Sequence, residues 1–158
     1  MTTQSSKDVT CCICGNTSSH TFLKSTNQLG APDLDTRPGE MMRSTINLWV
    51  QRCPSCGYSA PDISKCAPVT KVVVNTDDYK QIVSSEDLPR LATSFLSLSY
   101  EKRVSHEYPD AAWRAIHAAW ACDDAQNDKA AIECRKKAIE LIEQCTAHSQ
   151  VFAHQAGA

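Results

Sequence analysis

The sequence has no long apolar run and no apolar segment near its first residue. A membrane-spanning helix takes about 20 consecutive apolar residues, and no stretch of this 158-residue chain approaches that length, although 42% of its residues are hydrophobic. Residues 1–10 are polar and lack the apolar core of a secretory signal. We therefore expect a reducing, cytoplasmic environment, in which disulfides do not persist.

Neither half of the chain has an excess of basic residues. Residues 1–67 carry six Lys and Arg against five Asp and Glu, and residues 68–158 carry ten against thirteen, for a net charge of −2. Binding to a phosphate backbone needs a basic patch or stripe. We therefore do not expect a nucleic-acid partner. A nucleic-acid-binding ribbon would require one shared face for the following side chains: Lys24, Arg43, Arg52 and Lys65.

Catalytic motifs are missing as well. The chain contains no glycine-rich phosphate loop, no nucleophile elbow and no HExxH sequence. His117 and Cys122 are five positions apart, which on a helix separates them by about 140 degrees, so they cannot act as a pair. Cys134 and Cys145 lie on or beside an apolar helical face, where a cysteine is usually a small core residue. We expect a non-enzymatic protein.

What the sequence does contain is cysteine, nine residues in all. Two CxxCG motifs, at Cys11 to Gly15 and Cys53 to Gly57, each place two thiols on a tight turn followed by a glycine. Two such turns in one chain strongly indicate a four-thiolate structural metal site. The predicted ligands are Cys11, Cys14, Cys53 and Cys56. Cys12 is the non-ligating neighbour, and Cys66 is expected to be a free thiol.

The metal is expected to be zinc, because a closed four-thiolate site leaves no position for a substrate and suits a redox-inert ion. Iron is the alternative, since Cys53 to Tyr58 is similar to the metal-binding turns of rubredoxins. The 38 residues between Cys14 and Cys53 are longer than the rubredoxin loop, and aromatic residues make up only 6% of the chain.

Strands are expected in the N-terminal half of the chain, next to the cysteine turns. Residues 19–25 read as a short strand with Phe22 buried, whereas residues 1–10 are expected to be disordered. Residues 45–52 alternate apolar and other side chains, and this pattern predicts the best strand in the chain, leading into Cys53. A strand before each cysteine turn is typical of a zinc ribbon.

The segment between the cysteine turns holds other polar candidates. Residues 26–44 form a loop rich in turn-forming residues. Its aspartates, Asp33 and Asp35, could hold a cation, but we expect them to cap turns and pair with Arg37 or Arg43. The imidazole of His20 could replace a cysteine as a ligand, although four well-spaced cysteines make a surface position the better prediction.

The second half has helical periodicity of about 3.6 residues. Helices are predicted after a cap at Thr76 or Asp77, and from Leu88, Pro109 and Asp128. The fold class is therefore α+β. The expected regions are a zinc-ribbon-like part over residues 1–67, a helical part over 68–148 and a mobile tail over 149–158.

The last two predicted helices resemble a known helical repeat. Residues 113–141 look like one tetratricopeptide repeat (TPR), an antiparallel helical hairpin. The positions that match are Trp113, Ile116, Ala119, Trp120, Ala131 and Ala138. Together with the two CxxCG motifs and the Pro-Asp-Leu-Asp-Thr-Arg-Pro loop, residues 11–145 resemble a bacterial family defined as a domain of unknown function.

That resemblance implies a bacterial cytoplasmic zinc-ribbon protein with a TPR-like helical part, but it supplies no established activity. We therefore expect a structural zinc ion that stabilises a protein-interaction module, with a protein as its partner. Trp49, Trp113 and Trp120 are expected in the core rather than in a binding groove.

Overall fold

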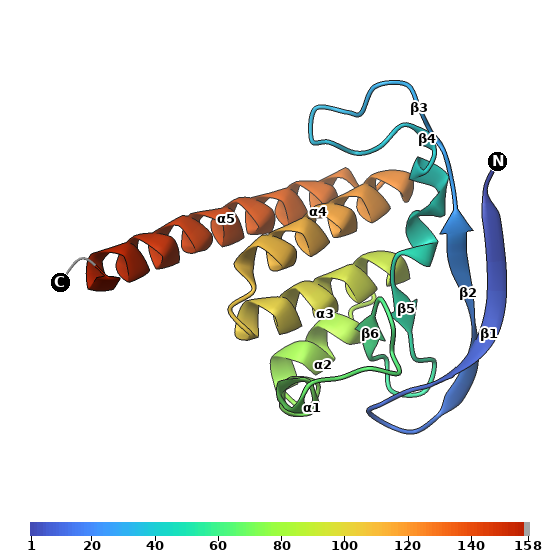
Figure 1. Ribbon diagram of the computed structural model, residues 1–158, viewed down its shortest axis with the longest axis horizontal. Coiled ribbons are helices and arrows are strands. Elements are labelled where there is room, and N and C mark those ends of the chain that lie inside the picture. The colour runs from blue at the N-terminus through green and yellow to red at the C-terminus, as the bar shows by residue number, and fades with distance from the viewer. Residues whose placement is uncertain (157–158) are drawn as a thin grey trace. The chain divides into compact units, whose positions relative to one another are not determined.

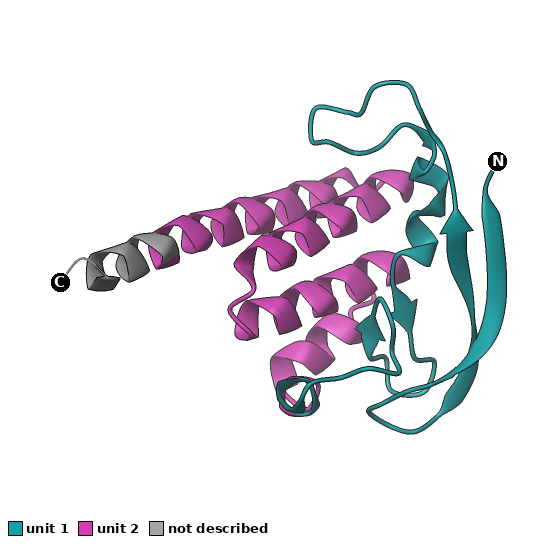
Figure 2. Ribbon diagram, in the orientation of Figure 1, with its two compact units in different colours: residues 1–71 teal, residues 72–158 magenta. Residues whose placement is uncertain are grey.

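The structure is a computed structural model that describes the backbone of residues 1–156 and the side chains of residues 1–148. The tail predicted to be mobile, residues 149–158, lies outside these described side chains. The chain divides into two compact units, residues 1–71 and residues 72–158 (Figure 2). Within the described residues, no helix has both the length and the apolar character needed to cross a bilayer.

The first unit is built from short antiparallel strand pairs and a single 3-10 helix (Figure 1). Strand β1 pairs with β2, β3 with β4, and β5 with β6. In chain order the elements are β1 Thr3–Thr10, β2 Thr17–Ser25, β3 Gln28–Leu29, β4 Glu40–Met41, the 3-10 helix η1 Arg43–Leu48, β5 Gln51–Arg52 and β6 Ser59–Ala60, followed by α1 Pro68–Val73 at the junction of the units.

The longest strand pair, β1 with β2, includes a segment that was predicted from the sequence to be disordered. Residues 1–10 are ordered here, so that prediction is wrong, whereas the strand predicted over residues 19–25 is confirmed and begins earlier. The pair is antiparallel, and hydroxyl groups meet across it, as between Thr10 and Thr17 at 2.9 Å. Because the stabilising partner lies in another segment, the composition of residues 1–10 alone does not reveal it.

The prediction of a strand over residues 45–52, the best strand expected from the sequence, is also wrong. Its first half, residues 45–48, belongs to η1, and only its last two residues form β5. Local side-chain hydrogen bonds favour the helical turn: the Thr45 hydroxyl donates to the Met42 carbonyl at 2.7 Å, and the Trp49 indole donates to the Thr45 hydroxyl at 2.9 Å. Such local bonds compete with a strand ladder.

The second unit consists of helices joined by short turns: α2 Asp77–Val83, α3 Arg90–Val104, α4 Tyr108–Asp124 and α5 Asp128–Ala156. Helix α3 packs on α4, and α4 packs on α5. The mixture of small antiparallel sheets and helices confirms the α+β class.

The starts of these helices follow from local sequence. The Thr76 hydroxyl accepts a hydrogen bond from the Tyr79 amide and caps α2, as predicted. Pro109 lies in the first turn of α4, where its missing N–H leaves no hydrogen bond unmade. Helix α3 begins only after Pro89, a little later than the predicted start at Leu88.

Small side chains let α4 and α5 approach closely. Their buried contact consists of Ala111, Ala112, Ala115, Ala138 and Leu141. The tryptophans behave differently from one another. Trp120 is buried, as expected of a core residue, whereas Trp113 is 46% exposed.

Candidate metal centre

Each CxxCG motif is the turn of a strand pair. The first turn joins β1 to β2, and the second joins β5 to β6. The two turns share one hydrogen-bond pattern: the amides of Gly15 and Gly57 donate to the carbonyls of Cys11 and Cys53, at 2.9 and 3.0 Å. Both glycines have a positive φ, 74° and 76°, a conformation that residues with a Cβ resist. A strand therefore precedes each cysteine turn, although the sequence did not predict β1 and predicted a much longer strand than β5.

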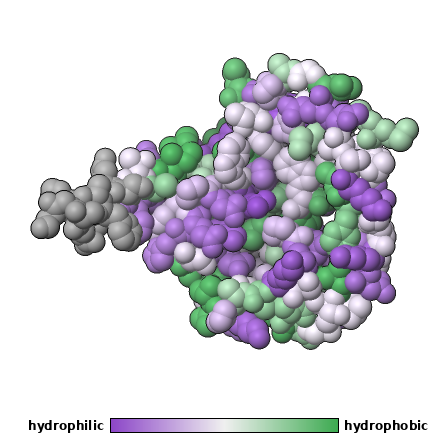
Figure 3. Space-filling view, in the orientation of Figure 1, coloured by the Kyte–Doolittle hydropathy of each residue, from purple (hydrophilic) through white to green (hydrophobic). Residues whose placement is uncertain are grey.

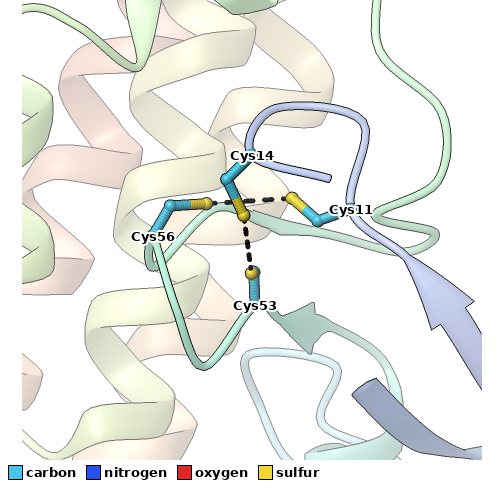
Figure 4. A group of neighbouring side chains, drawn as sticks. All are labelled: Cys11, Cys14, Cys53 and Cys56. Carbon is cyan, nitrogen blue, oxygen red and sulfur yellow. Dashed lines mark hydrogen bonds between the residues drawn. The ribbon is translucent and has the colours of Figure 1, made fainter. Parts of the chain in front are cut away.

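The two turns bring four sulfur atoms together (Figure 4). The Sγ atoms of Cys11 and Cys56 are 3.7 Å apart, those of Cys14 and Cys53 are 3.5 Å apart, and all four lie within 4.8 Å of one another. A metal–thiolate bond of about 2.3 Å places the sulfurs of a tetrahedral site about 3.8 Å apart. The cluster therefore has the dimensions of a four-thiolate metal centre.

Burial divides the four cysteines into two kinds. The first cysteine of each turn is buried, Cys11 being 1% exposed and Cys53 0%, whereas Cys14 and Cys56 are exposed. Burial raises the pKa of the Cys11 thiol, and the hydrogen bond from the Asn16 backbone lowers the pKa of the Cys14 thiol to about 7. Four thiols this close can all lose their protons only with a cation between them.

A disulfide lies directly beside this cluster, contrary to the expectation of an environment in which disulfides do not persist. Cys12, the neighbour of Cys11, is bonded to Cys66, and their Cα atoms are 6.1 Å apart. Cys12 is outside the cluster, in agreement with the predicted non-ligating role, but the prediction that Cys66 is a free thiol is wrong. The two residues are 54 positions apart, so spacing gives no sign of the pairing.

Backbone hydrogen bonds hold the segment that carries Cys66 against the first turn. The Cys12 amide donates to the Ile63 carbonyl at 2.8 Å, and the Ile63 amide donates to the Gln51 side chain at 3.1 Å. The side chain of Ile63 is fully buried. This arrangement, rather than any sequence motif, brings Cys66 to Cys12.

The other N-terminal candidates lie outside the cluster. His20 is on β2, where its Nε2 is 2.8 Å from the Ser18 hydroxyl, and it takes no part in the sulfur cluster. Asp33 forms an ion pair with Arg43 at 2.7 Å, and its carbonyl accepts a hydrogen bond from the Thr36 amide. The loop aspartate therefore pairs with an arginine, as expected.

The cysteines of the helical unit are structural. Cys122 and Cys134 are buried, and burial raises the pKa of both thiols, that of Cys134 to about 12. A buried thiol that stays protonated is a poor nucleophile. Cys134 is therefore the small core residue expected from the sequence, whereas Cys145, for which the same was expected, is only partly buried.

A groove in the helical unit was not foreseen. A cavity of about 750 Å³ opens between the start of α3 and α5, with Leu88, Leu96 and Cys134 among its lining residues. Lys129 and Glu133 also line it. Nothing in the spacing of the sequence marks these residues as neighbours, because they meet only when α3 and α5 flank α4.

Comparison of the chain with protein-family models, with curated proteins and with solved structures gives no significant match.

Proposed function

We propose that Cys11, Cys14, Cys53 and Cys56 hold a structural zinc ion and that this ion stabilises a non-enzymatic protein-interaction module. The observation that carries the proposal is the pair of sulfur separations, 3.5 and 3.7 Å, which match the edge of a tetrahedral thiolate site. All four coordination positions are then filled by protein, which leaves none for a substrate.

The choice of zinc rests on chemistry, because an iron site would have similar sulfur separations. Thiolate donors suit either ion. Zinc has no redox chemistry, so it fits a site whose task is to hold two turns together. Iron would instead make this a rubredoxin-like electron carrier.

The ion would supply stability that the first unit otherwise lacks. Strands β1 and β2 contain a single buried residue, Val9, and β3 to β6 are only two residues long each. A structural zinc site can contribute on the order of 10 kcal/mol to folding. The metal would therefore replace much of a hydrophobic core.

The interaction role would belong to the helices. We take α4 and α5 as a TPR-like hairpin, on the strength of their alanine-rich contact. A protein partner fits the mixed charges of the helical unit better than a nucleic acid does, since this part of the chain has more acidic than basic residues. The proposed setting is that of the resembled family, the bacterial cytoplasm.

The test is the metal content of protein purified without added metal, measured by elemental analysis together with a visible spectrum. We expect one zinc per chain in the wild type, and its loss together with the structure of the first unit in Cys53→Ser. Cys145→Ser is the matched control, because it removes a thiol outside the cluster, and it should keep the zinc.

Two outcomes would overturn the proposal. Wild-type protein that is metal-free and still folded in its first unit would refute the metal centre. Bound iron with a reversible one-electron couple would replace the structural role by electron transfer.

A further inference from the structure

Helix α5 exposes a row of large apolar side chains outside its contact with α4. Ile132, Ile139 and Ile142 are 54%, 56% and 51% exposed. Their spacings of seven and three residues place them on one face of the helix. We call these three residues the isoleucine stripe. Apolar surface is visible in this part of the helical unit beside the residues drawn in grey (Figure 3).

A different face of α5 packs inside the helical unit. Ala131, Cys134, Ala138 and Leu141 are buried, and two of them belong to the contact with α4. The isoleucine stripe is therefore a second apolar face on the same helix. Ile132, Ile139 and Ile142 occupy a and d positions of one heptad register, as in a coiled-coil seam, and Arg135 fills the d position between the first two.

Charge is distributed unevenly along α5. Its first ten residues contain four cations against two acids, namely Lys129, Arg135, Lys136 and Lys137 against Asp128 and Glu133. The next ten contain two acids, Glu140 and Glu143, and no Lys or Arg. The exposed surface of the helix is therefore basic toward its start and acidic further along.

This polarity is self-complementary when two such helices run in opposite directions. Lys136 and Glu143 are both exposed and, being seven residues apart, lie on the same side of the isoleucine stripe. In an antiparallel pair, Lys136 of each copy faces Glu143 of the other. In a parallel pair, the position of Lys136 would face the position of Ala131 in the other copy, so its charge would find no acidic partner there.

We propose that the isoleucine stripe is a self-association surface, at which the α5 helices of two copies of this chain pair antiparallel. The two-fold axis passes close to Ile139, and each copy presents the same surface to the other. Because three half-exposed side chains per copy bury less than the ~1,200 Å² of a standard interface, the dimer is weak and reversible. The proposal does not depend on the metal centre.

The first test measures mass by sedimentation and light scattering over a rising concentration series of the full chain. We expect the wild type to pass from monomer to dimer and Ile139→Glu to stay monomeric. Gln144→Glu is the matched control, since it adds the same charge at an exposed α5 position outside the stripe, and it should dimerise like the wild type. Circular dichroism checks that each variant is folded.

The second test fixes the direction of pairing. Lys136→Glu and Glu143→Lys should each weaken the dimer, and the loss should shrink at high salt. An equimolar mixture of the two variants should dimerise more tightly than either one alone, because each opposite-charge pair is then restored. In the wild type, Lys136 also pairs with Glu133 on its own helix at 2.9 Å, so circular dichroism of each variant is needed here too.

A wild type that remains monomeric at the highest concentration would overturn the proposal, and the isoleucine stripe would then be a binding surface for another protein. A dimer that survives Ile139→Glu would place the interface elsewhere. A mixture of the charge variants that shows no recovery would refute the antiparallel arrangement. None of these outcomes affects the metal content by which the proposed function is judged.

Discussion

His117 lies within the helical unit among aromatic rings. Its ring centroid is 5.3 Å from that of Phe95, 5.1 Å from that of Trp120 and 6.3 Å from that of Trp113. Burial lowers the pKa of this imidazole to about 4, and the positive charge of Arg114 acts in the same direction, while Asp110 opposes it. His117 is therefore neutral at neutral pH.

This pKa makes the helical unit sensitive to acid. The unfolded chain binds a proton at His117 near pH 6.5, whereas the folded chain binds it only near pH 4. Stability is complete above pH 6.5 and falls as the pH approaches 4, by up to roughly 3 kcal/mol, since a tenfold change in the equilibrium is worth about 1.4 kcal/mol.

Urea unfolding of the full chain, followed by helical circular dichroism from pH 7 to 4, measures this loss. His117→Gln should flatten the dependence, and Trp113→Phe, which keeps a ring beside the imidazole, should retain it. A wild-type slope that survives His117→Gln would show that other groups are responsible.

Cysteine positions show what spacing can and cannot reveal. The ligand candidates could be identified because each turn is local. In each one, a glycine with positive φ follows the second cysteine, and its amide donates a hydrogen bond to the carbonyl of the first. The Cys12–Cys66 bond could not, because it depends on how residues 58–66 fold back to the first turn. Local chemistry is visible in sequence, and long-range pairing is not.

The same distinction holds for helices and strands. The starts of α2 and α4 were predicted because Thr76 and Pro109 act within one turn. Strand β1 was missed because its partner is β2, and residues 45–52 were assigned the wrong structure because their alternating pattern was outweighed by side-chain hydrogen bonds at Thr45.

The disulfide should help the chain to bind the proposed zinc ion. It closes a loop between residues 54 positions apart, which in the chain-entropy account removes about 4 kcal/mol of freedom from the unfolded, metal-free chain. The double variant Cys12→Ser/Cys66→Ser should therefore bind zinc roughly 100- to 1,000-fold more weakly.

Competition with a coloured chelator measures that affinity. Cys145→Ser, which leaves both the disulfide and the cluster intact, is the control and should bind zinc like the wild type. Equal affinities for the double variant and the wild type would mean that the metal-free chain is already ordered without the disulfide.

The whole chain combines two units with different sources of stability. The first depends on cross-links between its strand turns, a sulfur cluster and a disulfide. The second has a packed helical core, including Phe95, Leu98 and Trp120. The α+β class followed from the change of periodicity between the two halves, whereas the groove on the helical unit required the packing of α3 and α5 about α4.

Removal of the metal should therefore act on one unit only. We expect a strong chelator to abolish the strand structure of residues 1–71 and to leave the helical signal of residues 72–158 almost unchanged. Circular dichroism and hydrogen exchange, read separately for the two units, provide the measurement. A loss of helix in step with the metal would show that the units do not fold independently.

The β1–β2 hairpin has a thermodynamic consequence. Its strands are rich in serine and threonine, and Val9 is their one buried residue. The heat capacity of unfolding comes mainly from newly exposed apolar surface. Opening of this hairpin should therefore be almost silent in calorimetry, while its amide protons exchange freely with solvent. A calorimetric melting curve of this protein will therefore record the unfolding of the helices and will not detect the opening of its longest sheet.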